Sequence, residues 1–334
     1  MACTTEHGLK TLRVVYGDVT LGLHGEGFDY IFSHSAGGPV SMVFNGREWL
    51  YRAPRPTFWR ATTDNDRGNG FSFTSAMWMG ADLFVETVET RVFADGRRET
   101  AVIAPDNNRH RGDVPACEVR VEYTYRTSTV PRTTVDVGYT VSADGAVRVD
   151  VLYHGAKGLP ELPVFGLRFI MPTAAEGYAY QGLSGETYPD RMAGGVRGYY
   201  EVKGLPVTPY LVPQDCGVHM ETEALTVTRR TVLANERAGR NSSVTAGECG
   251  GERFSVKFSM VDTPFAFSCL PYTALELESA THQEELPPAR RTVVCILGAV
   301  RGVGGIDSWG SDVEKDYHID GETDIAFAFR LERA

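Results

Sequence analysis

The residues of this sequence that could bind a ligand or carry chemistry gather in a few short segments, the first of which is residues 57–70. It reads TFWRATTDNDRGNG and contains four polar side chains of interest: Arg60, Asp64, Asn65 and Asp66. Carboxylates and amides grouped in this way can bond to sugar hydroxyls or to a hard cation, although a calcium loop normally supplies a longer ladder of oxygens. Asp and Asn also bond to their own backbone in turns, so a structured loop ending in glycine explains the segment equally well.

A second candidate segment, residues 302–313, reads GVGGIDSWGSDV and places Asp307, Ser308 and Trp309 in a glycine-rich turn. Glycine offers no side chain against which an indole can pack, so Trp309 is a candidate platform for a sugar, whose C–H face packs on an aromatic ring. The alternative is a core tryptophan that closes one end of the fold. The glycines superficially suggest a phosphate loop, but the GK[ST] ending is missing, which argues against one.

Two histidines are candidates for proton transfer. His219 lies in YLVPQDCGVHM, and His282 lies in ATHQEEL. The neighbouring Glu284 and Glu285 could tune the pKa of His282 or supply a base. A single histidine among apolar residues is more often a packing residue whose hydrogen bonds are satisfied, and we favour a structural role for both histidines.

Residues 181–200 form a glycine-flanked segment around the sequence YPDR. Glu186 and Asp190 could act as a pair of carboxylates in acid–base catalysis, but neither has an evident partner in the sequence. A proline followed by adjacent opposite charges is typical of a rigid corner with an internal ion pair, and we favour this structural role. The sequence has no nucleophile elbow, zinc-protease, Walker or dinucleotide-binding motif.

Composition disfavours several classes of protein. Of 334 residues, 33 are Lys or Arg and 43 are Asp or Glu, which gives a formal net charge of −10 and disfavours nucleic acid or an anionic membrane as partner. Six scattered cysteines without a CxxC pair indicate reduced thiols rather than a disulfide frame or a zinc site. Residues 1–10 lack the apolar core of a secretion signal, and no apolar run is long enough to span a membrane, so we expect a cytoplasmic protein.

The elements that must position these segments are mainly β-strands. Alternating or continuous apolar patterns predict strands at residues 18–23, 118–125, 133–141, 147–152, 225–228, 232–234, 254–260, 292–297 and 325–329. The Asp144-Gly145 turn predicts a hairpin over residues 133–151, and residues 225–228 and 232–234 are expected to form a further pair. Short helices are predicted at residues 73–83 and at residues 274–280, the latter capped by Thr273. Frequent turns favour one large antiparallel β-sandwich over alternating βα units. We expect residues 1–11 to form a tail and residues 12–334 to form a single domain.

Six segments, taken in order along the chain, resemble the small subunit of heterodimeric β-galactosidases. This subunit is equivalent to the C-terminal sandwich domain of the long single-chain enzymes of glycoside hydrolase family 2. The segments are YGD with GEGF (16–18 and 25–28), FWRATTDNDRG (58–68), YPDR (188–191), PYLVPQDCGVHM (209–220), ATHQEEL (280–286) and GVGGIDSWG (302–310). Each is modest alone, but six in the expected order are a specific signature.

The resemblance implies a β-supersandwich like that of galactose mutarotases. It implies a part in the retaining hydrolysis of terminal β-D-galactosides such as lactose, with transgalactosylation as a side reaction. In this family the two catalytic glutamates and the magnesium ligands lie in a TIM barrel, which this chain lacks. We therefore expect no catalytic residue and no cofactor in this chain. We expect a heterodimer with a large subunit that carries the barrel and its Mg²⁺, with Na⁺ as a further candidate. Apolar surface should be exposed on the strands where that subunit docks.

The resemblance also implies roles for the two candidate segments. In the family, the tryptophan of the GGxxSW turn forms part of the sugar platform, and Trp309 matches it, with Asp307 and Ser308 beside it. The RAxTDND loop lies at the mouth of the barrel, and the residues that match it are Arg60, Asp64, Asn65 and Asp66. The sequence departs from the family at Ile306, where acidic residues are common.

Two other functions remain open from the sequence. A free-standing mutarotase-type (aldose 1-epimerase-like) enzyme needs a histidine acid and a carboxylate base that face one cavity, and His219 or His282 with a glutamate are the candidates. A pure sugar-binding module would differ from the subunit only in lacking a catalytic partner.

Overall fold

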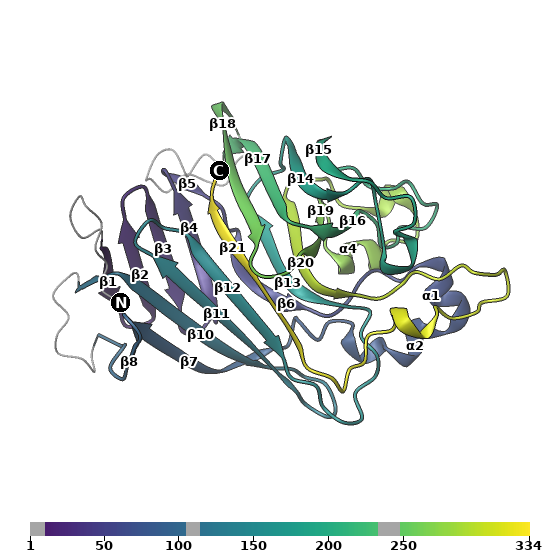
Figure 1. The fold of residues 1–334 in the computed structure, drawn as a ribbon, viewed down its shortest axis with the longest axis horizontal. Helices are drawn as coiled ribbons and strands as arrows, with labels where there is room; N and C mark the ends of the chain where they lie inside the picture. Colours follow the sequence, from purple (N-terminus) through teal and green to yellow (C-terminus); the bar gives the residue numbers. More distant parts are fainter. Residues whose placement is uncertain (1–10, 105–113, 233–247) are drawn as a thin grey trace.

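The computed structural model describes residues 11–104, 114–232 and 248–334. In this part of the chain the strands form three sheets, every pairing between them is antiparallel, and the helices are short (Figure 1). The predicted antiparallel β fold is therefore confirmed. Residues 1–10 of the expected tail lie outside the described residues.

The sheets have six, ten and five of the described strands. The first has the order β5 (Arg47–Glu48), β4 (Gly38–Phe44), β3 (Phe28–Ser33), β2 (Thr20–Gly25), β1 (Leu12–Tyr16), β9 (Val114–Ala116). The second has the order β15 (Arg197–Lys203), β14 (Gly177–Leu183), β17 (Ala224–Val232), β18 (Glu248–Met260), β21 (Ile325–Arg333), β12 (Val147–Tyr153), β11 (Thr134–Ser142), β10 (Glu118–Arg126), β7 (Glu86–Ala94), β8 (Arg97–Glu99). The third has the order β16 (Val218–Thr222), β19 (Phe265–Leu270), β20 (Thr292–Val300), β13 (Val164–Met171), β6 (Arg52–Thr57).

The ten-stranded sheet packs one face against both smaller sheets, which makes a sandwich. In β10, alternate residues such as Val121 and Tyr123 are buried on this inner face. Aromatic rings fill the space between the layers. One such contact joins the ten-stranded sheet to the six-stranded sheet, and another joins it to the five-stranded sheet. These contacts are Phe32 with Tyr139, at 5.8 Å between centroids, and Phe169 with Phe329, at 6.0 Å. The two smaller sheets adjoin each other, since β4 lies against β6.

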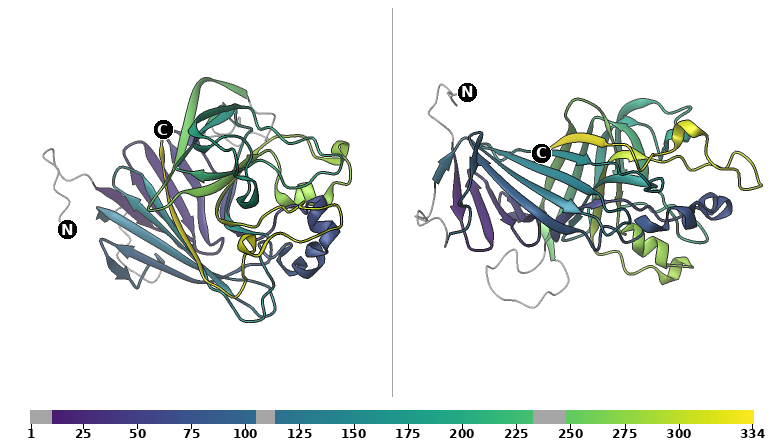
Figure 2. Two further views of the ribbon diagram at one scale, coloured as in Figure 1. Left: turned by 45° about the vertical axis from the view of Figure 1, so that its right-hand side comes forward. Right: turned by 90° about the horizontal axis from the view of Figure 1, so that it is seen from below.

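The helices lie at one end of the sandwich. They are α1 (Asp64–Asn69), α2 (Phe71–Thr74) and α4 (Ala274–Ser279), with single 3₁₀ turns η1 (Ala76–Trp78), η2 (Pro189–Arg191), η3 (Gln283–Glu285) and η4 (Lys315–Tyr317). Figures 1 and 2 show α1 and α2 at the same end as the long yellow loop that follows β20, away from β1 and β2. No helix in the described residues is long and apolar enough to cross a membrane.

Two predicted elements agree closely with the structure. Strands β11 and β12 form the expected hairpin, with Val141 opposite Val147 and with Gly145 at φ +85° in the turn. The helix predicted at residues 274–280 is α4. Its first turn is closed by a capping box, in which the Thr273 side chain accepts from the backbone N–H of Glu276 and the Glu276 side chain accepts from that of Thr273.

Two other predicted elements are wrong. Residues 73–83 are not one helix, because Ser75 leaves helical geometry between α2 and η1 and Gly80 turns the chain at φ +77°. Residues 225–228 and 232 are not two paired strands but parts of one strand, β17, and residues 233–234 lie outside the described residues. In the sequence, the polar run in the middle of β17 looks like a break between two strands. In the fold, Arg229 of this run is fully buried, with its guanidinium 5.1 Å from the ring of Trp49, so the strand continues through it.

Candidate functional site

The segment of residues 57–70 is not an open loop, because α1 occupies its second half. Thr63 caps the helix: its hydroxyl accepts from the backbone N–H of Asp66 at 3.1 Å, and the Asp66 carboxylate accepts from the backbone N–H of Thr63 at 3.0 Å. Gly70 ends the helix in the left-handed region, at φ +81°. The sequence signal for this helix was the capping pattern T-x-x-D, with Asp in place of the usual Glu or Gln.

Arg60 and Asp66 form a buried ion pair inside the fold. One guanidinium nitrogen of Arg60 donates to both carboxylate oxygens of Asp66, at 2.9 and 3.1 Å. The guanidinium also donates to the backbone carbonyls of Arg301 and Gly302, at 2.7 and 2.8 Å. Both side chains are buried, so the pair joins α1 to the start of the tryptophan turn and does not face solvent. These two residues act as positioning residues.

Two asparagines continue the contact between α1 and the tryptophan turn (residues 302–313). The amide of Asn65 donates to the carbonyl of Val303 at 2.8 Å, and the amide of Asn69 donates to the carboxylate of Asp312 at 3.0 Å. Asp312 in turn accepts from the buried guanidinium of Arg301 at 2.6 Å. Helix and turn are therefore held together along the length of α1.

The YPDR corner supports the other side of the same turn. The Asp190 carboxylate accepts from the backbone N–H groups of Val303 and Gly304, at 3.0 and 2.8 Å, and Arg191 donates to the carbonyl of Gly304. Glu186 is instead bonded to Thr208 at 2.9 Å. These contacts match the structural role favoured from the sequence, since Asp190 is used to hold backbone and is not paired with Glu186.

Trp309 projects from this braced turn into solvent. Its exposed fraction is 91%, so the alternative of a core tryptophan does not hold. The Asp307 carboxylate accepts from the Ser311 hydroxyl and from the backbone N–H groups of Trp309 and Ser311, and these bonds lower the pKa of Asp307. Ser308 is exposed beside the indole. The turn thus presents an exposed indole on a fixed backbone.

Asp64 lies in a different environment from Asp66 although only one residue separates them. The Asp64 side chain is 74% exposed and is paired with Arg67 at 3.2 Å. Of the four candidates in this segment, Asp64 is the one open to a ligand, Asn65 is partly buried, and the other two are buried. Among the described residues, no group of three or more His, Cys, Asp or Glu side chains is placed to hold a metal ion.

The close approach of the turn to α1 gives a testable prediction. A Cβ on Gly310 would lie 2.9 Å from the carbonyl oxygen of Gly68, and Gly310 has φ +83°. Gly194 has φ +85°, but a Cβ there meets nothing within 4 Å. Gly194→Ala should cost about 1–2 kcal/mol of unfolding free energy from backbone strain alone. Gly310→Ala should cost about 1–3 kcal/mol more, because the turn must also move off the helix. Urea unfolding measures both, and equal losses would contradict the close contact.

The two candidate histidines lie in separate places. His219 is buried among aromatic rings and stacks on Phe267 at 4.8 Å. Its ring nitrogens are bonded to the Tyr178 hydroxyl at 3.0 Å and to the Gly185 carbonyl at 2.7 Å, so neither of these partners is a carboxylate. His282 is exposed at the start of η3, with a ring nitrogen 3.3 Å from the Glu285 carboxylate.

The burial of His219 predicts a dependence of stability on pH. Burial lowers the pKa of His219 to about 4. Because the unfolded value is about 6.5, the unfolded state binds more protons between these pH values. The stability that neutral His219 contributes is therefore complete above about pH 6.5 and is lost as the pH falls toward 4.

We expect wild type to lose about 2–3 kcal/mol more unfolding free energy than His219→Phe between about pH 7 and pH 4. Urea unfolding at a series of pH values measures this difference. Burial raises the pKa of Asp215 to about 7, which acts in the opposite direction, but both proteins retain Asp215 and its contribution cancels in the comparison. Identical pH slopes for the two proteins would contradict the assignment.

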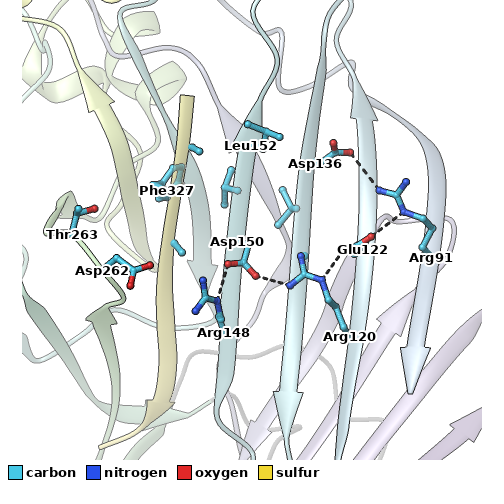
Figure 3. Close-up of a pocket in the computed structure, with 15 residues that line it drawn as sticks. Arg91, Arg120, Glu122, Asp136, Arg148, Asp150, Leu152, Asp262, Thr263 and Phe327 are labelled. Carbon is cyan, nitrogen blue, oxygen red and sulfur yellow. Dashed lines mark hydrogen bonds and ion pairs between the residues drawn. The ribbon is translucent and has the colours of Figure 1, made fainter. Parts of the chain in front are cut away.

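A groove of about 590 Å³ lies on the outer face of the ten-stranded sheet, and the sequence pattern did not predict it. Gly138 and Ala328 are among the residues that line it, and the guanidinium of Arg120 lies over Gly138. Figure 3 shows its charged side chains pointing toward one another across neighbouring strands. Arg120 donates to Glu122 at 2.7 Å and to Asp150 at 2.5 Å. These charges compensate one another, and no candidate residue from the sequence lines the groove.

Comparisons with known proteins identify the family. The model of the family described as "Beta galactosidase small chain" matches residues 24–331. The chain is 60% identical to the "Beta-galactosidase small subunit" of Latilactobacillus sakei, over 96% of this chain and 98% of that protein. It is 34% identical to a "Beta-galactosidase" of Halalkalibacterium halodurans over 96% of this chain, but it spans only 28% of the length of that protein.

Among solved structures, a putative aldose 1-epimerase from Escherichia coli K12 is similar over 97% of this chain and 99% of that chain. The identity is 11% and the TM-score is 0.42, which is too distant to add to the description of the fold. The sequence comparisons are decisive by themselves. The match to the family model over residues 24–331, together with a relative of the same extent at 60% identity, shows that this chain belongs to the beta-galactosidase small chain family.

Proposed function

We propose that this chain works as the non-catalytic half of a two-chain β-galactosidase that hydrolyses terminal β-D-galactosides such as lactose with retention. In this proposal the catalytic glutamates lie on a large subunit. The name of the Latilactobacillus sakei relative, a small subunit, supports the existence of such a partner. The length relation supports it too, because single-chain relatives such as that of Halalkalibacterium halodurans are more than three times as long as the region matched here.

The observation that carries the proposal is the exposed indole of Trp309 on a braced turn. An exposed tryptophan costs free energy in water, and hydrogen bonds to the backbone hold the turn in the conformation that exposes it. A pyranose ring presents C–H groups that pack on such a surface, while Asp307 and Ser308, which precede Trp309 in the chain, offer polar groups beside it. Trp309 would hold galactose or the aglycone against the large subunit and exclude water from one side of the site.

We also propose which metal ions the two-chain enzyme uses and where in the cell it works. We place Mg²⁺, with Na⁺ as a further candidate, on the large subunit. We place the enzyme in the cytoplasm, where thiols stay reduced. Free thiols at Cys216, Cys269 and Cys295 are compatible with a reducing compartment.

Mixing purified chains tests the function. This chain alone should hydrolyse o-nitrophenyl β-galactoside at the background rate, the large subunit alone should be slow or inactive, and the mixture should be fully active. A normal rate from this chain alone would overturn the division of roles. Polarimetry on fresh α-galactose checks the alternative of a free-standing epimerase, which predicts faster mutarotation by this chain without any partner.

A further inference from the structure

Six large apolar side chains are exposed on one short stretch of the chain and the loop that touches it. They are Phe73, Met77, Met79, Leu83, Phe84 and Val130, and we call them the apolar patch. Phe73 and Phe84 are 84% and 69% exposed. The backbone N–H of Val130 lies 3.3 Å from the sulfur of Met77, which brings the β10–β11 loop against the rest of the patch.

The stretch that carries the patch is well anchored, so the exposure does not come from a loose segment. Trp78 is fully buried in the middle of it, stacks on Phe58 at 5.4 Å between ring centroids, and donates its indole N–H to the carbonyl of Pro160. Asp82 is buried as well and forms an ion pair with Arg168 at 2.6 Å. The apolar side chains therefore face solvent because the anchored backbone directs them there.

Charge is almost absent from the stretch that carries five of the six side chains, residues 71–84. Residues 71–84 read FSFTSAMWMGADLF and contain one charged residue, the buried Asp82, whereas 23% of the whole chain is charged. Exposed charges begin just beyond, where Glu86 pairs with Arg126 at 2.5 Å. A charge-free centre of aromatic residues and methionine, bordered by charged residues, is the usual composition of the core and rim of a protein interface. An exposed patch of this kind marks an interaction site.

The patch is continuous with the proposed sugar site. Helices α1 and α2 are separated only by Gly70, so the helix that braces the tryptophan turn leads directly into the patch. The amide of Asn69, the last residue of α1, is bonded to Asp312 of that turn. Figures 1 and 2 show these helices and the yellow loop at the same end of the molecule. A chain that covers Trp309 from this end also reaches α2.

We propose that the apolar patch is the centre of the interface with the large subunit and binds an apolar surface that flanks the active site of that subunit. This inference rests on the proposed function. It places the centre of the docking surface on α2, η1 and the loop segments next to them, and not on the strands where the sequence led us to expect it. The patch supplies affinity, while Trp309 supplies the contact with sugar.

A pair of double variants tests this division. Phe73→Ser with Phe84→Ser removes the two most exposed rings of the patch. Val19→Ser with Val114→Ser is the matched control, because both valines are exposed at the opposite end of the molecule, Val19 in the turn between β1 and β2 and Val114 in β9. Circular dichroism first establishes that both variants are folded, and calorimetry then gives the Kd of each for the large subunit.

We expect the patch variant to raise the Kd about tenfold or more, as the loss of central aromatic contacts does in protein interfaces, and the control to leave it unchanged. At saturating concentration the patch variant should restore full galactosidase activity, because Trp309 is intact. If wild type gives an active complex and the patch variant binds with the wild-type Kd, this inference is overturned while the proposed function stands. If wild type neither binds the large subunit nor activates it, both fail together.

A second copy of this chain is the competing occupant, and light scattering on the isolated chain examines it. An isolated wild-type dimer that the patch variant converts to monomer, with no change in Kd for the large subunit, would overturn the inference in favour of self-association.

Discussion

Asp66→Ala is expected to lower the free energy of unfolding by about 3–5 kcal/mol, since it leaves a buried guanidinium without its anion. The Asp66 carboxylate accepts from Arg60 and from the backbone of Thr63, and it lies 3.8 Å from the guanidinium of Arg301. Alanine removes all of these interactions and also the capping box of α1. Urea unfolding followed by circular dichroism gives the loss.

Asp64→Ala is the matched control, because it removes a carboxylate from the same helix two residues earlier. Its side chain is exposed and its ion pair with Arg67 is on the surface, so the change should be within about 0.5 kcal/mol. If both variants lost the same small amount, the Arg60–Asp66 pair would not be holding α1 to the tryptophan turn.

Trp309→Ala is expected to raise the KM of the two-chain enzyme for lactose about 10- to 100-fold and to leave the stability of the isolated chain unchanged. A rise of this size corresponds to about 1.4–2.7 kcal/mol, which is typical of the loss when a tryptophan that contacts a ligand is truncated, whereas an indole that is almost fully exposed contributes little to folding. The ratio of transfer to hydrolysis should also fall, because the indole would orient the acceptor sugar. Steady-state kinetics with product analysis measures both quantities.

Ile306→Ala is the control on the same turn. Ile306 is also exposed, but an aliphatic side chain offers no flat face to a pyranose ring, so KM should stay within about twofold of wild type. An unchanged KM and an unchanged transfer ratio for Trp309→Ala would remove Trp309 from the site.

Strands with regular alternation were predictable because one face of the sheet is buried, whereas β13, which is buried at every position and does not alternate, was not predicted. Alternation in β10 follows from Val121 and Tyr123 pointing to the core while Arg120 and Glu122 point outward. Strand β17 was wrongly predicted as two strands, and the reason is tertiary. Arg229 breaks the apolar pattern but is buried, lies over Trp49 and donates to the Glu48 carbonyl, which are contacts between residues about 180 positions apart. Local pattern cannot reveal a charge that a distant segment accommodates.

The residues of the candidate site could be nominated by type but not assigned their roles. Trp309 was recognisable because glycines surround it. The sequence did not reveal that Asp66 is buried while Asp64 is exposed. The burial of Asp66 depends on Arg60, which bonds both to Asp66 and to backbone more than 240 residues away in the chain. The exposure of Phe73 and Phe84 could not be predicted from the sequence either. A helix over that segment would bury one apolar face against the core, and some of its apolar residues would then be buried.

The most direct test of a sugar contact at Trp309 uses the tryptophans as probes. Of the four tryptophans in the chain, Trp49, Trp59 and Trp78 are buried and Trp309 is exposed. In the isolated chain, acrylamide should quench mainly Trp309. In the complex with the large subunit, the difference in quenching between wild type and Trp309→Phe should shrink, and it should shrink further on addition of a galactoside at saturating concentration. A difference that neither the large subunit nor the galactoside alters would contradict the contribution of Trp309 to the sugar site.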